Sequence, residues 1–218
     1  MALVIFDLDH TLLSGDSDHA WGQYLVDRGL VEPAEHQRRN DYFYQQYQAG
    51  TLDILEYLAF ALKPLTQHPL ELMLAERQRF LDERIKPLIS QKSRDLIAKH
   101  QQAGDTLLII TATNGFVTYP IAGLLGIEHI IAPEPELIDG NYTGAIVGIP
   151  SFQHGKVTRL QQWLEDKQLD LSGSYFYSDS HNDLPLLEQV DHPVAVDPDD
   201  ILNARAQQQG WPVISLCL

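Results

Sequence analysis

The sequence predicts an α/β fold: a doubly wound, Rossmann-like parallel sheet with a helical cap inserted after its first strand. Three observations indicate this. An unbroken apolar run, Ala2 to Phe6, opens the chain, residues 14–86 show helical spacing without a good strand, and strands and helices alternate after Pro87. The expected division is a core formed by residues 1–13 and 87–218, with residues 14–86 as the cap.

The first strand carries the first functional hint. A short apolar run that ends in acidic residues is typical of a strand buried on both faces of a parallel sheet. Ligands of open α/β sheets bind at the carboxyl ends of the strands, where Asp7 and Asp9 follow. Side chains two residues apart point to the same side. Two carboxylates so close together need a cation or a shared proton.

Residues 14–86 are expected to form about four helices, divided by Pro33, Gly50, Pro64 and Pro69. An aromatic cluster between Tyr42 and Tyr47 is expected to pack in the helix bundle, with ligand stacking as the alternative. Because this segment follows the first strand, it is expected to lie over the carboxyl edge of the sheet and close the site as a lid.

After Pro87 the chain is expected to complete the sheet. An Asp139-Gly140 pair indicates the turn of a hairpin over residues 137–148. Helices are expected over residues 88–104, 115–125 and 155–167. The expected strands are residues 106–110, 129–132, 174–178, 193–196 and 212–216.

The composition and net charge indicate which classes of binding partner to expect. The 218 residues include 15 Lys and Arg against 30 Asp and Glu, a net charge of −15 that argues against nucleic acid and anionic membranes. A single cysteine, Cys217, excludes an internal disulfide and indicates a reducing compartment. The chain shows neither a signal peptide nor a stretch long enough to span a membrane, so we expect a cytoplasmic protein.

Polar residues follow three of the expected strands. Asp7 and Asp9 follow the first, Thr111 the second and Asp179 a later one, while Lys156 lies near the start of the helix before that last strand. A carboxylate can attack phosphorus and form an aspartyl-phosphate. Mg²⁺ held by one or two carboxylates would neutralise the phosphoryl oxygens, and Asp7 and Asp179 are suitable ligands.

The remaining residues suit the same chemistry. The Thr111 hydroxyl and the Lys156 ammonium can hold phosphoryl oxygens. The backbone N–H groups after Thr111, beginning at Ala112, stand at the start of a helix and form an anion site. Asp9 can protonate the leaving alcohol and then deprotonate water.

These motifs resemble the four-motif signature of the haloacid dehalogenase (HAD) superfamily. The matching residues are Asp7-Leu8-Asp9-His10-Thr11, then Thr111, Lys156 and the run Asp179–Asp183. They occur in the family's order, and the resemblance covers essentially the whole chain.

The resemblance implies a role for each residue. Asp7 is the nucleophile and Asp9 the general acid and base, while Thr111 and Lys156 stabilise the phosphate. Mg²⁺ is bound by the Asp7 carboxylate, the Asp9 carbonyl and Asp179, with Asp183 supporting the metal.

The run Asp179–Asp183 looks most like the phosphoserine-phosphatase branch, in which Asn182 contacts the substrate and an acid at position 16 holds its amine. Thr111-Ala112-Thr113-Asn114 departs from the Ser-Gly-Gly of that branch, and only Arg38 and Arg39 could hold a serine carboxylate. Histidinol phosphate has an amine and no carboxylate. The chain therefore looks more like the histidinol-phosphatase-like enzymes, with Asp16, Ala112 and Asn182 as further substrate-binding residues. Asp18 and His19, or the aromatic cluster between Tyr42 and Tyr47, could meet the imidazole ring of such a substrate.

Several alternatives stay open at this point. The chain could be a phosphoserine phosphatase, or a phosphotransferase or phosphomutase of the same superfamily. A signalling receiver domain uses a similar set of residues but in a different order and in a shorter chain, and a catalytically inactive binding protein would not need the intact acids. The expected partner is a small phosphomonoester, and the protein is expected to be a monomer or a homodimer.

Overall fold

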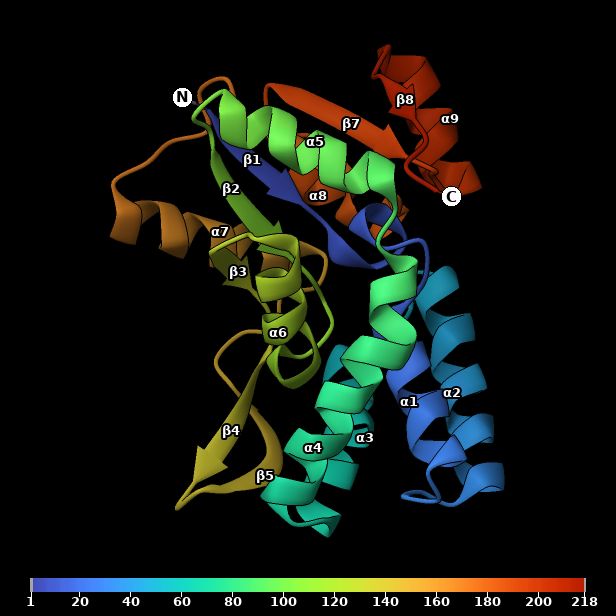
Figure 1. Ribbon diagram of the computed structural model, residues 1–218. Coiled ribbons are helices and arrows are strands. Elements are labelled where there is room, and N and C mark those ends of the chain that lie inside the picture. Colours follow the sequence, from blue (N-terminus) through green and yellow to red (C-terminus); the bar gives the residue numbers. More distant parts are fainter. Residues whose placement is uncertain (1, 218) are drawn as a thin grey trace.

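A computed structural model describes residues 2–217 and contains a parallel sheet of six strands in the order β3-β2-β1-β6-β7-β8 (Figure 1). From β1 the sheet grows first through β2 and β3 to one side and then through β6, β7 and β8 to the other. This order confirms the doubly wound prediction. The strands are β1 (Leu3–Phe6), β2 (Thr106–Ile110), β3 (His129–Ile131), β6 (Tyr175–Ser178), β7 (His192–Val196) and β8 (Val213–Ile214).

Strand β1 lies at the centre of the sheet and is buried on both faces. Val4 and Phe6 belong to the core beneath α5 and α6, whereas Leu3 and Ile5 belong to the core beneath α7, α8 and α9. Two helical layers explain why the strand is an unbroken apolar run instead of an alternating one. These helices are α5 (Gln91–Gln102), α6 (Gly115–Leu125), α7 (His154–Lys167), α8 (Leu184–Leu187) and α9 (Asp200–Gln209).

Four helices between β1 and α5 form a separate group at the carboxyl end of the strands, and we call them the cap helices (Figure 1). Both crossings between sheet and cap lie side by side, since Leu13 and Ile89 form an isolated antiparallel bridge. The cap helices are α1 (Ser17–Asp27), α2 (Pro33–Gln48), α3 (Ile54–Gln67) and α4 (Leu70–Phe80). Short turns flank them at η1 (Leu8–Leu12), whose Asp9 and His10 are not helical, and at η2 (Leu81–Ile85) and η3 (Lys86–Leu88).

A hairpin of β4 (Glu134–Ile138) and β5 (Asn141–Val147) extends from the sheet along the cap. Its turn is the expected pair, with φ of 49° at Asp139 and 77° at Gly140, which matches a two-residue hairpin turn. Strand β5 packs against α3 (Figure 1). The hairpin belongs in sequence to the segment 87–218, and it packs beside the cap through the contact of β5 with α3.

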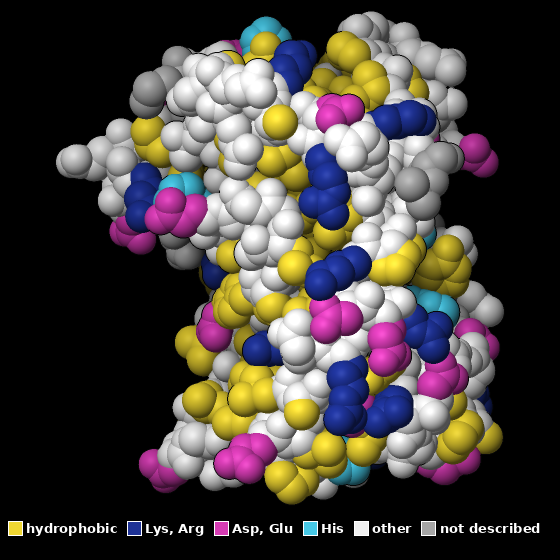
Figure 2. Space-filling model, viewed as in Figure 1, with side chains coloured by type: hydrophobic (Ala, Val, Ile, Leu, Met, Phe, Trp, Pro, Cys, Tyr) yellow, Lys and Arg dark blue, Asp and Glu magenta, His cyan; other side chains and the backbone are white. Residues whose placement is uncertain are grey.

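The surface view shows how the charges are distributed on one face. Lys and Arg side chains there are interspersed with Asp and Glu, and no continuous basic patch forms on the face shown (Figure 2). Within residues 2–217, no helix combines the length and the apolar character that a membrane span requires.

The start of α7 generates a stability prediction. A Cβ added at Gly155 would lie 2.0 Å from the Pro150 carbonyl oxygen, whereas one added at Gly123 in α6 would meet open space. We expect Gly155→Ala to lower the free energy of unfolding by about 3 kcal/mol. Gly123→Ala is the matched control and should stabilise by up to about 1 kcal/mol. Urea unfolding measures both, and equal effects of the two changes would contradict the close contact at Gly155.

Candidate active site

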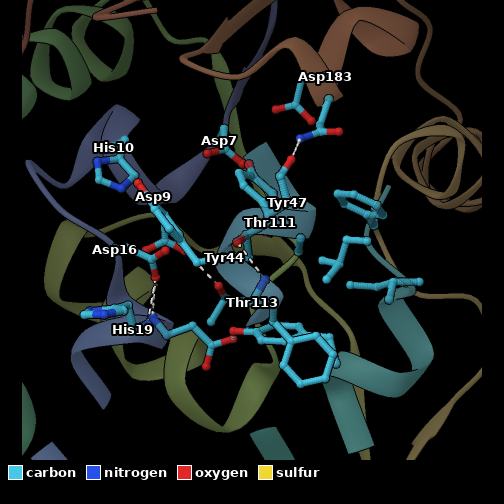
Figure 3. Close-up of a pocket in the computed structure, with 18 of the residues that line it drawn as sticks. Asp7, Asp9, His10, Asp16, His19, Tyr44, Tyr47, Thr111, Thr113 and Asp183 are labelled. Atoms are coloured by element: carbon cyan, nitrogen blue, oxygen red, sulfur yellow. Dashed lines mark hydrogen bonds between the residues drawn. The ribbon is translucent and has the colours of Figure 1, made fainter. Parts of the chain in front are cut away.

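The loops that follow β1, β2 and β6 converge on one pocket that the cap helices close from the other side (Figure 3). Nine residues were expected at the site, and eight of them line this pocket. These are Asp7, Asp9, Asp16, Thr111, Ala112, Lys156, Asn182 and Asp183. Asp179 lines an adjoining hollow, which shares His10, Asp16, Tyr44 and Tyr47 with the pocket.

A buried ion cluster forms the floor of the pocket. The Lys156 ammonium lies 2.6 Å from Asp7 Oδ1 and 2.8 Å from the Asp183 carboxylate. Burial alone would lower the pKa of Lys156, but Asp183 and Asp7 outweigh it and raise that pKa. Burial raises the pKa of Asp7 to about 7 although Lys156 opposes the shift. Lys156 is therefore an internal counter-ion and not a solvated surface lysine.

Asp179 adds a third carboxylate beside this cluster. Burial, Asp7 and Asp183 together raise its pKa well above the ordinary value. Thr11 holds it in place, because the Thr11 hydroxyl accepts a hydrogen bond from the Asp179 backbone N–H and donates one to Asp179 Oδ1, both at 3.1 Å. Sequence analysis quoted Thr11 within the first motif but gave it no role.

The donor set of this floor fits Mg²⁺. No group of three or more His, Cys, Asp or Glu side chains within residues 2–217 forms a ready-made metal cage. Mg²⁺ needs less from a protein, since it commonly takes one or two carboxylates and fills its other positions with water and substrate oxygens. Asp7, Asp179 and Asp183 carry more negative charge than Lys156 offsets, and burial makes that excess costly. A divalent cation would relieve it, with Asp7 and Asp179 as the residues best suited to hold it.

Asp9 lies apart from the ion cluster and is oriented by two donors. Its carboxylate accepts from the Ser17 backbone N–H at 2.6 Å and from the Thr113 hydroxyl at 2.8 Å. Burial and the neighbouring Asp16 raise its pKa to about 6. This raised pKa favours the protonated form of Asp9 more than that of an ordinary aspartate. Thr113 was missed as its partner, although its place two residues after Thr111 gives the two the same parity.

Thr111 is held at the end of β2. Its carbonyl accepts from the buried Ser151 hydroxyl at 2.6 Å, and its own hydroxyl accepts from the Thr113 N–H at 3.1 Å. Helix α6 begins at Gly115 after its N-cap Asn114, so the N–H of Ala112 precedes the helix and does not stand at its start as expected.

The cap side of the pocket is acidic and aromatic. Asp16 caps α1 by accepting from the Asp18 and His19 N–H groups, both at 2.9 Å. Asp18 is only 7% exposed and accepts a 2.6 Å hydrogen bond from the Tyr57 hydroxyl of α3. Burial raises the pKa of Asp18 from its ordinary value of 3.8 to about 7, although the bond from Tyr57 opposes the shift. Asp18 and His19, which were expected to meet an imidazole ring, both line the pocket, whereas Tyr57 was not among the expected site residues.

The aromatic residues between Tyr42 and Tyr47 differ in their positions relative to the pocket. Phe43, Tyr44 and Tyr47 line the pocket, whereas Tyr42 is 50% exposed and lies outside the lining. Within this one stretch of α2, Phe43 is buried in the packing of the cap, and Tyr44 and Tyr47 face the pocket at its surface.

Among the described residues, none of the pocket's lining side chains is an arginine. Lys156 is the one Lys or Arg among the described residues that line it. Arg38 and Arg39 lie outside, and Arg39 pairs with Glu56 at 3.2 Å. A serine carboxylate would therefore find no guanidinium here.

Comparison with known proteins identifies the family. Residues 4–188 match the family model of the haloacid dehalogenase-like hydrolases. The chain belongs to this family. It is 48% identical, over 98% of both chains, to a protein of Neisseria meningitidis serogroup C (strain 8013) named histidinol-phosphatase.

Solved structures agree on the fold of this HAD hydrolase. A protein of unknown function from Bordetella pertussis Tohama I shares 45% identity, with a TM-score of 0.93 over 99% of this chain and 98% of the other. A substrate-bound phosphoserine phosphatase shares the fold at 17% identity, with a TM-score of 0.70 over 98% of this chain and 92% of the other. The protein is a HAD-type phosphatase, a phosphoric monoester hydrolase.

The burial of Asp18 generates a stability prediction. When a carboxyl has a higher pKa in the folded protein than in the unfolded chain, the free energy of unfolding falls as the pH rises from the unfolded pKa through the folded pKa. Asp18→Asn should therefore be more stable than wild type at about pH 8, and the difference should shrink towards about pH 4. Thermal unfolding across this range measures it. A variant less stable than wild type at the upper pH would contradict the cost assigned to the Asp18 charge.

Proposed function

We propose that this HAD phosphatase hydrolyses L-histidinol phosphate through an aspartyl-phosphate intermediate and uses Mg²⁺. One observation carries the choice of substrate: the recognition end of the pocket presents Asp9, Asp16 and Asp18 with aromatic walls and, among its described lining, no arginine. Histidinol phosphate brings an ammonium and an imidazole and has no carboxylate. The name of the Neisseria meningitidis relative supports the same choice.

The chemistry begins with nucleophilic attack. A carboxylate oxygen of Asp7 attacks phosphorus, and the bond from phosphorus to the ester oxygen breaks. That oxygen takes a proton from Asp9 and leaves as the alcohol. Bound Mg²⁺ would supply positive charge for the phosphoryl oxygens. Thr111 and Lys156 hold those oxygens as charge develops on them.

The second half of the reaction returns the enzyme to its starting state. Asp9 takes a proton from water, whose oxygen attacks phosphorus while the bond from phosphorus to Asp7 breaks. Inorganic phosphate leaves and Asp9 is protonated again. A carboxyl with a pKa of about 6 suits both directions near neutral pH, since donor and acceptor forms are both populated.

Substrate recognition follows from the charges around the cap. With the phosphate on the floor, the amine of histidinol would meet Asp9 and Asp16, and its ring would reach Asp18 and Tyr44. Phosphoserine would place a carboxylate against the same acids, with a cost that only Lys156 could offset. Lys156 pairs with Asp7 and Asp183 at the floor and holds the phosphate there, so it does not neutralise a carboxylate at the cap end.

The acid–base role of Asp9 predicts the behaviour of its amide variant. Asp9→Asn should lower kcat for p-nitrophenyl phosphate by about 100-fold or more, because the variant cannot donate or accept the proton. Its binding of Mg²⁺, measured calorimetrically, should persist because the backbone carbonyl is unchanged. Asp7→Asn serves as the control without a nucleophile and should be inactive. Unchanged turnover in Asp9→Asn would refute the role.

The proposed contact of Asp18 with the substrate predicts that its replacement changes substrate specificity. In wild type, kcat/KM for histidinol phosphate should exceed that for phosphoserine by about tenfold or more. Asp18→Asn should lower kcat/KM for histidinol phosphate by about tenfold while changing that for p-nitrophenyl phosphate by less than about threefold. Asp166→Asn, an exposed change on α7, is the matched control. A wild-type preference for phosphoserine would rule out the proposed substrate.

A further inference from the structure

Residues 150–156 connect the floor of the pocket to the cap through an unusual backbone. Ser151 bonds to Thr111 and Lys156 belongs to the ion cluster, and Gln153 stands between them. Gln153 has φ 48° and ψ −122°, a conformation that residues with a side chain rarely adopt. Such a conformation persists only where its surroundings hold it, and it commonly marks a functional constraint.

The side chain of Gln153 reaches two separate parts of the protein. Its amide nitrogen donates to the Gly50 carbonyl of the turn between α2 and α3 at 3.3 Å, and to Asn182 Oδ1 at 2.9 Å. Asn182 Nδ2 in turn donates to the Tyr47 carbonyl at the end of α2, at 3.2 Å. Gln153 and Asn182 thus join the cap to the loop that follows β6.

The two backbone carbonyls at the ends of this chain of hydrogen bonds fix which groups donate and which accept. The carbonyls of Tyr47 and Gly50 can only accept, so Asn182 must turn its NH₂ towards Tyr47 and its oxygen towards Gln153. Gln153 must then present its NH₂ to both acceptors. A carboxylate at position 153 has no hydrogen to donate and would face two oxygens.

Close packing at the same place supports the contact. Gly50 has φ 68°, and a Cβ added there would lie 3.2 Å from His181 Nε2. Tyr47 lines the pocket (Figure 3), and it also lines the adjoining hollow that contains Asp179. The end of α2 therefore rests directly on the loop that carries Asp179, Asn182 and Asp183.

We propose that Gln153 is a positioning residue that latches the α2–α3 turn of the cap onto the loop of Asn182, and so holds the cap closed over the pocket. The resemblance assigns Asn182 to substrate contact, but here both ends of its amide are engaged by the latch. Only the phosphatase activity of the protein is assumed, and the identity of the substrate is not.

The test compares two glutamines, both with positive φ, on opposite ends of α7. Gln153→Glu should lower kcat/KM for p-nitrophenyl phosphate by about tenfold, because a cap that fails to close leaves the site poorly assembled. Gln168→Glu is the matched control at φ 56°, and it should stay within about twofold of wild type. In Gln153→Glu, hydrogen exchange should accelerate in the peptide 46–55 and stay unchanged in β2.

A second variant separates latching from stability. Gln153→Gly removes the amide and relieves the strained backbone, so its Tm should match or exceed that of wild type while kcat/KM still falls. The latch is overturned if kcat/KM of Gln153→Glu or Gln153→Gly stays within about twofold of wild type, or if exchange in 46–55 is unchanged. Wild type that hydrolyses p-nitrophenyl phosphate but not histidinol phosphate would refute the proposed substrate and leave this test intact.

Discussion

The ammonium of Lys156 between Asp7 and Asp183 is the interaction on which the site depends. It joins the end of β1, the loop after β6 and the first turn of α7 in one buried cluster. Removing one partner of a buried ion pair typically costs about 3–5 kcal/mol of stability, because the other charge is left buried without a counter-ion. Gly155 serves this contact, since only a glycine fits against Pro150 immediately before Lys156. The position of the counter-ion thus constrains the backbone that precedes it.

Charge also separates the two ends of the pocket. At the floor, Asp7, Asp179 and Asp183 carry more negative charge than one lysine offsets, which favours a divalent cation and then a phosphate. At the cap, Asp16 and Asp18 have no lysine or arginine among the described lining residues, which favours a cation on the substrate itself. A ligand with a phosphate at one end and nitrogen bases at the other satisfies both ends at once. A uniformly anionic ligand satisfies only the floor.

The sequence could predict the features that depend on neighbouring residues along the chain. The strands ending at Asp7 and Thr111, and the turn at Asp139-Gly140, depend on apolar runs and turn chemistry, and the parallel sheet brings the strand ends together by itself. The Asp18–Tyr57 contact spans 39 residues between two cap helices, and it depends on how those helices pack. No periodic pattern reports that packing. Gln153 left no signal either, because its strain and partners exist only in the folded chain.

The latch has to be weak as well as specific. Hydrogen bonds of this kind contribute about 1 kcal/mol each to stability. The strained backbone at Gln153 opposes them by about 1–3 kcal/mol. With three such bonds, the closed and open arrangements lie within a few kcal/mol of each other. An equilibrium so nearly balanced is one that substrate contacts can shift towards closure and product loss can release. Strain at Gln153 then has a use: it keeps the cap from closing too tightly over a pocket that must empty after each turnover.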